Sequence, residues 1–443
     1  MGCAESCRGL ARHDDDTRPQ SAPPTTGNTG QTSTVALPLD LPSPQPLWHV
    51  PLPGPPADTA LEHVTGPVVM PGTGSGDTLV LMTSSATGVV AIATDTGAVR
   101  WQHPDEQSPG PPIVVRTNDN DMVWLSGRCA HRMENAQTLF DTRADTAAVI
   151  NEHILGCVEV VDRAGHVHEQ VWIRVNENAL SSSRGHGNAL GQLGENLIWG
   201  HGHDLFEISM PAGHVIAHRR MPIPDIGDDA GAAGIKGWIA HESALVVATA
   251  TGLAGFNACP PTTVCSPAWH LPWPRAAGVT GPVPTGPNVA WVRDQILQAG
   301  NHGRITWTTP DFHAYAPGSL ISTEDGTLLA LRLSSEGIRP VRIEPIHGQT
   351  VDQGTAVPGA QVLAATRWGS GLAAVIRLDA SLRHDVVIAW DNALNARWAW
   401  PIPEPTRPRI EPVGLTALPA NTGSGVIVFH DGRFVARLPP PAP

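Results

Sequence analysis

The side chains in this sequence that could do chemistry are mainly histidines and cysteines. Three of the 20 histidines, His186, His201 and His203, lie in the glycine-rich strings RGHGN and WGHGHD. Neutral imidazoles in threes can hold zinc, and these three fall at the ends of two strands predicted over 187–191 and 197–200. Their spacing matches no compact metal motif, and glycine-flanked histidines are also ordinary turn residues. The sequence therefore leaves them as weak candidate metal ligands.

Two pairs of cysteines predict disulfide bonds. Cys259 and Cys265 flank the string PPTTV at the tip of a predicted hairpin, so the two strands bring their side chains together. Cys129 and Cys157 flank the extra residues of one long repeat, and a bridge between them would staple the base of that insertion. Closing a loop of that size stabilises a fold by roughly 3 to 4 kcal/mol in the chain-entropy model. Paired cysteines indicate an oxidising compartment.

The familiar catalytic strings are missing from the sequence. It contains no Gly-x-Ser-x-Gly elbow, no P-loop and no His-Glu-x-x-His. The string DIGDD at 225–229 superficially suggests a calcium loop, but it lacks the alternating ligands and terminal glutamate of a twelve-residue site, so we expect a solvated loop. We therefore predict no catalytic residues, no resident cofactor and no enzymatic activity.

Composition narrows the class of protein. The formal net charge of −13 over 443 residues provides no basic field for a polyphosphate, so nucleic acid is not an expected partner. The 45 glycines and 43 prolines, with only 16% charged residues, favour many short strands over long helices. No run of 18 apolar residues exists. Contact with a membrane is therefore expected only through a lipid anchor.

The elements that must position these residues repeat along the chain. Residues 88–101, GVVAIATDTGAVRW, read as two strands joined by a turn at Asp95-Thr96-Gly97 and closed by Trp101. Related strings follow at 158–172, 205–218, 252–269, 296–307, 338–352, 386–398 and 426–438. Most steps are roughly 40 to 50 residues, a period typical of propellers and solenoids. His166 and His168 alternate along one of these strands and are expected to face solvent or a neighbouring blade.

Another pair of strand-like runs precedes each hairpin, which gives four strands per repeat. We therefore predict an all-β, eight-bladed β-propeller over residues 46–443, with seven blades as the alternative because the copy at 338–352 is poor. The last repeat supplies only three strands before the chain ends. Leu47 to Val50 is predicted to supply the fourth, so that the first and last segments share one sheet and close the ring.

The unit GVVAIATDTGAVRW resembles the repeat of quinoprotein-like (PQQ-like) propellers, whose motif pairs such a turn with a closing tryptophan. That family includes quinone-dependent dehydrogenases, which hold the quinone in the central channel with calcium, a catalytic aspartate and, in many members, a disulfide between adjacent cysteines. No adjacent cysteines occur here. The resemblance therefore implies the non-catalytic branch, similar to the lipoprotein subunit of the outer-membrane β-barrel assembly machinery.

The amino terminus suggests a lipid anchor. Gly2-Cys3 resembles the end of a bacterial lipobox, which would make Cys3 the lipidated residue if translation begins upstream. Taken literally, Gly2 with Ser6 fits the N-myristoylation pattern. A third reading is an untethered tail. Residues 1–45 are rich in proline, threonine and aspartate with little to bury, so they are expected to form a disordered tether.

These patterns predict a non-catalytic cell-envelope propeller that acts as an interaction scaffold or presents a ligand site. Its expected location is extracytoplasmic, lipid-anchored in the outer membrane or periplasm. The expected partner is another envelope protein or a cell-wall component, and the chain is expected to be a monomer. A sugar- or metal-binding sensor is the first alternative, and a quinone-dependent dehydrogenase is the second.

Overall fold

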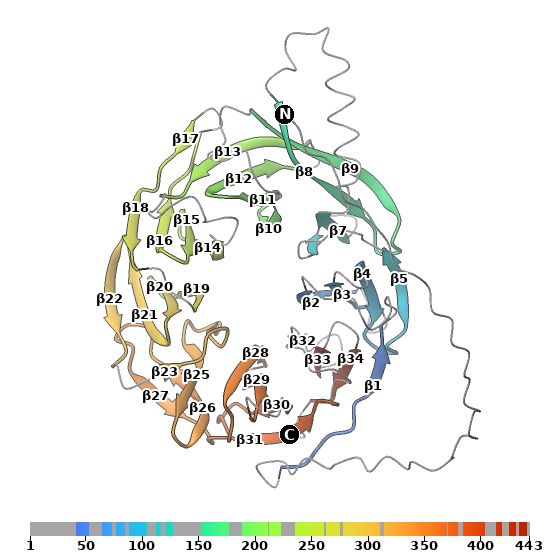
Figure 1. Cartoon of the computed structure of the whole chain (residues 1–443), viewed down its shortest axis with the longest axis vertical. Coiled ribbons are helices and arrows are strands. Elements are labelled where there is room, and N and C mark those ends of the chain that lie inside the picture. The colour runs from blue at the N-terminus through green and yellow to red at the C-terminus, as the bar shows by residue number, and fades with distance from the viewer. Residues whose placement is uncertain are drawn as a thin grey trace, which may run out of the picture. The chain divides into compact units, whose positions relative to one another are not determined.

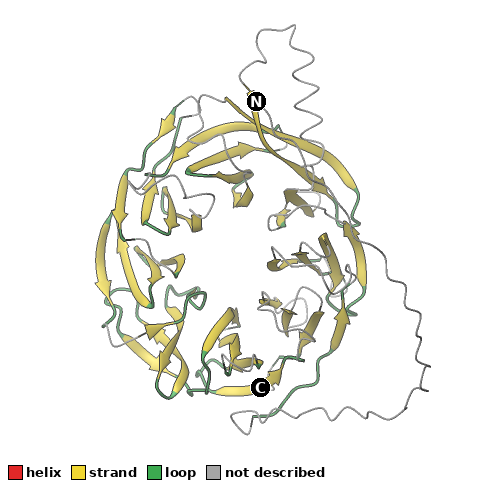
Figure 2. Cartoon of the chain, in the orientation of Figure 1, coloured by secondary structure: helices red, strands yellow, loops and turns green. Residues whose placement is uncertain are grey.

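The computed structural model describes residues 41–52, 64–72, 77–84, 88–103, 112–116, 121–126, 152–176, 188–210, 212–222, 235–260, 263–274, 278–310, 314–369, 371–379, 384–403, 413–418, 425–430 and 434–440. All regular secondary structure in these residues is β-strand (Figure 2). No helix long and apolar enough to cross a membrane is found among them.

The strands form eight sheets arranged in a ring, which is an eight-bladed β-propeller (Figure 1). Each sheet contains the four antiparallel strands of one blade, ordered from the inner to the outer edge. The first four blades are β2 (Val64–Met70), β3 (Leu79–Ser84), β4 (Gly88–Ala93) and β5 (Val99–His103); β6 (Ile113–Arg116), β7 (Asp121–Ser126), β8 (Glu152–Val161) and β9 (Val167–Asn176); β10 (Asn188–Leu193), β11 (Asn196–His201), β12 (Asp204–Ser209) and β13 (His214–Arg220); and β14 (Ile235–His241), β15 (Ala244–Thr249), β16 (Gly252–Phe256) and β18 (Trp269–Pro272).

The other four blades follow the same plan, and the sixth has its inner strand in two short pieces. They are β19 (Val279–Thr285), β20 (Asn288–Arg293), β21 (Ile296–Asn301) and β22 (Arg304–Thr308); β23 (Ala314–Tyr315) with β24 (Ile321–Ser322), β25 (Leu328–Ser334), β26 (Gly337–Ile343) and β27 (Thr350–Gln353); β28 (Gln361–Trp368), β29 (Gly371–Arg377), β30 (Asp385–Trp390) and β31 (Ala396–Pro401); and β32 (Val413–Leu418), β33 (Gly425–His430), β34 (Phe434–Leu438) and β1 (Trp48–Pro51).

The hydrophobic core lies between blades. Every residue of β4 is buried, because the sheet packs against a neighbouring blade on each of its two faces. Its apolar side chains divide accordingly. Val89 and Ala91 pack with Val123 of the second blade, whereas Val90 packs with Ile427 of the eighth. This arrangement explains why the central strands read as continuous apolar runs, since neither face meets water.

The predicted closure of the ring is confirmed. β1 pairs antiparallel with β34, with Trp48 opposite Arg437 and Val50 opposite Val435, and completes the eighth sheet. The segment before β1 also contacts the seventh blade, where the Ala399 backbone N–H donates to the Pro42 carbonyl at 3.1 Å. The predicted tether begins outside the described residues, which start at 41.

The weak copy at 338–352 forms a true hairpin, because β26 and β27 pair with Val341 opposite Gln353. The seven-bladed alternative is therefore wrong. The structure differs from the prediction in the hairpin expected over 252–269. β16 and β18 do pair, but the connection between them contains a further strand, β17 (Val264–Cys265), which crosses to the third blade and pairs parallel with β13. The long connection thus covers the outer edge of the preceding blade.

Candidate functional site at the seam of blades 1 and 2

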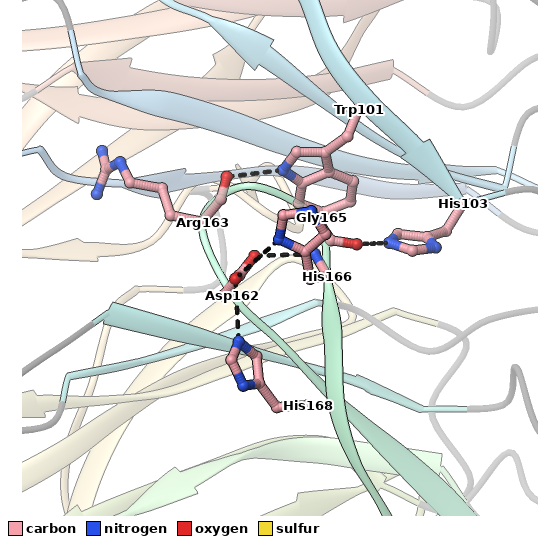
Figure 3. Close-up of polar contacts among 7 residues, drawn as sticks. All are labelled: Trp101, His103, Asp162, Arg163, Gly165, His166 and His168. Atoms are coloured by element: carbon pink, nitrogen blue, oxygen red, sulfur yellow. Dashed lines mark hydrogen bonds and ion pairs between the residues drawn. The ribbon is translucent and has the colours of Figure 1, made fainter.

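The turn between the two outer strands of the second blade, β8 and β9, is held by several polar contacts to Asp162. Asp162 follows β8, and its Oδ1 accepts the backbone N–H of His166 at 2.8 Å. Its Oδ2 lies 3.2 Å from Nδ1 of His166 and 2.9 Å from Nε2 of His168 (Figure 3). Gly165 completes the turn with φ of +89°, a conformation that favours glycine. One carboxylate therefore holds both the turn and the start of β9.

The electrostatics of this turn favour an ionised carboxylate. Partial burial raises the pKa of Asp162, but hydrogen bonds from the His168 ring and from the His166 backbone and ring outweigh that effect and hold the pKa at about 2, against an ordinary 3.8. His166 and His168 are both exposed, which is the first of the two expected environments. The turn therefore carries a fixed negative charge beside two imidazoles at the surface.

The outer strand of the first blade clamps the same turn. Trp101 of β5 lies over Gly165, and its indole Nε1 donates to the Arg163 carbonyl at 3.0 Å (Figure 3). A Cβ added to Gly165 would lie 2.6 Å from Cγ of Trp101, so only glycine lets the ring approach this closely. His103 Nε2 lies 2.8 Å from the Gly165 carbonyl oxygen. Trp101 and His103 of the first blade thus both contact backbone carbonyl groups of the second blade.

Arg163 of the second blade in turn contacts the first blade, so both blades contribute side chains to this seam, the contact region between β5 and the turn at 162–165. Its guanidinium donates to the Pro71 carbonyl at 3.0 Å and to the Asp77 carbonyl, and lies 3.5 Å from Oδ2 of Asp121. A surface pocket of about 440 Å³ opens beside it. The pocket is lined by Asp77, Leu79, Arg100, Trp101, Arg163 and Ala164. This combination of an indole, two guanidiniums and a carboxylate suits a polar ligand with an apolar face.

The tryptophan contact recurs at other seams. Trp48 of β1 donates to the Thr94 carbonyl at 2.8 Å and covers Gly97, which joins the eighth blade to the first. Trp307 of β22 donates to the Pro345 carbonyl at 2.8 Å and joins the fifth blade to the sixth. The turn glycine and closing tryptophan of the repeat therefore bind each other across blades, and not within one blade.

Two of the three histidines that the sequence offered as metal ligands lie among the described residues. His201 ends β11 and is buried, while His203 lies in the following turn and is half-buried. His186 lies outside the described residues, so the three-histidine hypothesis stays a prediction. Among the residues that the structure describes, no three histidine, cysteine, aspartate or glutamate side chains are placed to hold a metal ion.

One predicted disulfide is present, and the other is only half described. Cys259 and Cys265 are bonded, with their Cα atoms 6.1 Å apart. Cys157 in β8 is also disulfide-bonded, whereas its predicted partner, Cys129, lies outside the described residues. The candidate lipidation site Cys3 and the acidic string at 225–229 lie outside them as well.

Sequence reasoning missed a buried polar network in the third blade. Asp204 is fully buried, and its Oδ1 lies 2.8 Å from Nε2 of His218 and accepts the Arg220 Nε–H at 2.8 Å. Arg219 donates to Oε2 of Glu207 at 2.9 Å beside it. The run His218-Arg219-Arg220 gave a signal, since three consecutive basic residues on one strand require partners on both faces of the sheet.

Comparisons with known proteins add little to this geometry. No protein-family model and no curated protein matches the chain. A solved structure described as a eukaryotic initiation factor aligns over 89% of this chain and 94% of that one, with 11% sequence identity and a TM-score of 0.43. At that level the likeness carries no information about function.

Proposed function

We propose that this chain is a non-catalytic, quinoprotein-like β-propeller that serves as a scaffold in the cell envelope, where it presents the ring to another envelope protein or a cell-wall component. The observation that carries the proposal is the seam of tryptophan over glycine. The most conspicuous residues of the repeat, such as Trp101 and Gly165, join adjacent blades. A ring held in this way is a rigid frame, which suits the presentation of a surface.

The repeat supports the quinoprotein-like assignment. The strand–turn–strand unit from Gly88 to Trp101 forms β4, a turn and β5, as the motif implies. Its turn glycine, Gly97, receives Trp48 from the eighth blade, while its own tryptophan reaches the second blade. Each motif residue thus has a partner in a neighbouring copy, which is a reason for both to recur together.

The disulfide Cys259–Cys265 supports a location outside the reducing cytosol. A lipid on Cys3 would then hold the propeller at a membrane surface. Mass spectrometry of the native amino terminus tests this location: a diacylglyceryl group on Cys3 supports the anchor, and an unmodified first residue contradicts it.

A titration with pyrroloquinoline quinone and calcium tests the non-catalytic assignment. Purified protein is expected to develop no bound quinone chromophore and no dye-linked oxidation of alcohols or glucose. A bound chromophore with turnover would contradict the scaffold and favour the dehydrogenase alternative. Because this measurement uses purified protein, it is independent of the lipid analysis.

A sugar-binding sensor is the second candidate function, favoured by the pocket at the seam of blades 1 and 2. Trp101 and Leu79 supply apolar surface there, while Arg100, Arg163 and Asp77 supply polar groups. Saccharides need this mixture, since their rings present both apolar faces and hydroxyl groups. Calorimetric titration with soluble cell-wall saccharides tests the alternative, and an Arg100→Ala variant that binds equally well would remove the pocket from consideration.

A further inference from the structure

The strand β17 departs from the plan of the ring. In the other hairpins between third and fourth strands, the connection turns back within its own blade, whereas the connection from β16 to β18 runs over to the third blade. There Val264 pairs with His218 and Cys265 pairs with Arg219, in parallel orientation. β13 is already the fourth strand of its blade, so β17 is an added fifth strand on an outer edge.

The pairing itself is small, and a covalent bond holds it in place. Only two residues of β17 pair with β13, and the Val264 side chain remains 41% exposed. The Cys259–Cys265 disulfide closes the segment into a small loop, and Sγ of Cys259 lies 3.2 Å from the His218 carbonyl oxygen. Because a closed loop has little conformational freedom to lose, the disulfide lowers the entropy cost of keeping β17 on the edge.

The edge beneath β17 is rigid and fixed in register. His218 and Arg219, the two residues that β17 covers, are both buried and face the carboxylates of Asp204 and Glu207 from β12. His218 also stacks on Phe206, with ring centroids 4.4 Å apart. A strand edge with fixed main-chain groups is pre-organised to accept another strand, since little further ordering is needed on binding.

We propose that the outer edge of β13 is an acceptor site for an extended peptide, and that β17 occupies this site in cis while the Cys259–Cys265 disulfide is intact. The partner is a strand-forming segment that pairs parallel with β13 and places a β-branched residue where Val264 now lies. This inference deepens the proposed function, because it names the edge and the partner's chemistry. Its test uses purified protein and does not depend on where the protein resides.

The release of the site is a thiol–disulfide exchange with a dithiol reductant. One thiolate of the reductant attacks a sulfur of the Cys259–Cys265 bond, which breaks; a mixed disulfide forms and the other cysteine leaves as a thiolate. The second thiolate of the reductant then attacks the reductant's own sulfur in the mixed disulfide and releases the remaining cysteine, and both cysteine thiolates take up the protons that the reductant's thiols lost. Two electrons pass to the protein, which gains two thiols, and the reductant leaves as its own disulfide. Without the closed loop, β17 pairs with β13 through two residues only and can be displaced.

The test measures binding of a fluorescein-labelled peptide that copies residues 260–268 with Cys265→Ser. Fluorescence anisotropy compares the full-length oxidised chain with the double variant Cys259→Ser/Cys265→Ser, which removes this disulfide and leaves Cys157 bonded. We expect the double variant to bind at least about tenfold more tightly. A copy of the peptide N-methylated at alternate residues is expected to lose this binding, because strand addition requires its main-chain donors.

A second variant keeps the test independent of cysteine replacement. Val264→Pro in the disulfide-bonded chain removes a backbone N–H from β17 and is expected to open the edge in the same direction. Equal affinity of the oxidised chain and both variants would overturn the proposal, as would undiminished binding of the N-methylated peptide. Circular dichroism of each variant confirms that the ring is folded, and a folded variant that binds no peptide also counts against the proposal.

Discussion

Replacing Gly165 by alanine tests whether the tryptophan seam holds the ring. Two costs are expected. The residue has φ of +89°, and a side chain in the left-handed region costs about 1 to 2 kcal/mol. The new Cβ would also lie 2.6 Å from Cγ and 2.8 Å from Cβ of Trp101, so the indole must move.

Moving the indole has its own cost. It breaks the 3.0 Å hydrogen bond to the Arg163 carbonyl, worth about 1 kcal/mol, and overpacking of a buried contact costs about 1 to 3 kcal/mol. We therefore expect Gly165→Ala to lower the free energy of unfolding by about 2 kcal/mol more than the backbone strain alone accounts for.

Gly318→Ala is the matched control. Gly318 has φ of +79°, close to that of Gly165, but a Cβ added there would have nothing within 4 Å. Both variants share the backbone strain, so their difference isolates the clash with Trp101. Urea denaturation followed by tryptophan fluorescence measures the free energies of unfolding, and hydrogen exchange in β5 and β9 locates the loss. Equal destabilisation by the two substitutions would refute the structural role of the seam.

Three further outcomes are expected. Deleting residues 1–53 removes β1 and should lower the melting temperature, whereas deleting residues 1–40 should not; equal melting temperatures would argue against the closure by β1. Because the pKa of Asp162 is about 2 in the folded chain against an ordinary 3.8, its stabilisation is present above about pH 4 and is lost as the pH falls towards 2. Asp162→Asn should flatten the pH dependence of unfolding in that window, and an unchanged profile would contradict the assignment. Non-reducing peptide mapping should join Cys157 to Cys129, and a free thiol at Cys129 would exclude that pair.

The repeat made the hairpins predictable from sequence, since the spacing of Gly97 and Trp101 identifies a turn and the strand that follows it. The contact that joins blades was not predictable in the same way. Trp101 donates to the Arg163 carbonyl. Because every residue has a backbone carbonyl, the sequence does not indicate which one accepts this hydrogen bond. Only placement of the blades in a ring brings two groups so distant in the chain together.

The sequence predicted only part of the candidate site, because its contacts also join residues whose proximity depends on the fold. His166 and His168 were expected to face solvent or a neighbouring blade, but nothing in the sequence indicated that Asp162 contacts both of them. Asp162 contacts both imidazoles through its Oδ2 atom, at 3.2 Å from Nδ1 of His166 and 2.9 Å from Nε2 of His168. β17 was missed because a two-residue strand has no periodicity, and its partner β13 belongs to another blade.

The seams also explain how degenerate copies still close the ring. Between the sixth and seventh blades Leu394 stands where other turns have glycine, with φ of 59°, and its carbonyl accepts the Thr355 N–H at 3.1 Å. Between the second and third blades, a Cβ on Gly213 would meet the Trp172 carbonyl oxygen at 2.9 Å. In these seams the outer strand of one blade closely approaches a left-handed turn of the next blade. The indole that packs on the turn at other seams adds a further contact. The sixth copy, whose outer strand β27 contains no tryptophan, therefore keeps a backbone contact with the seventh blade.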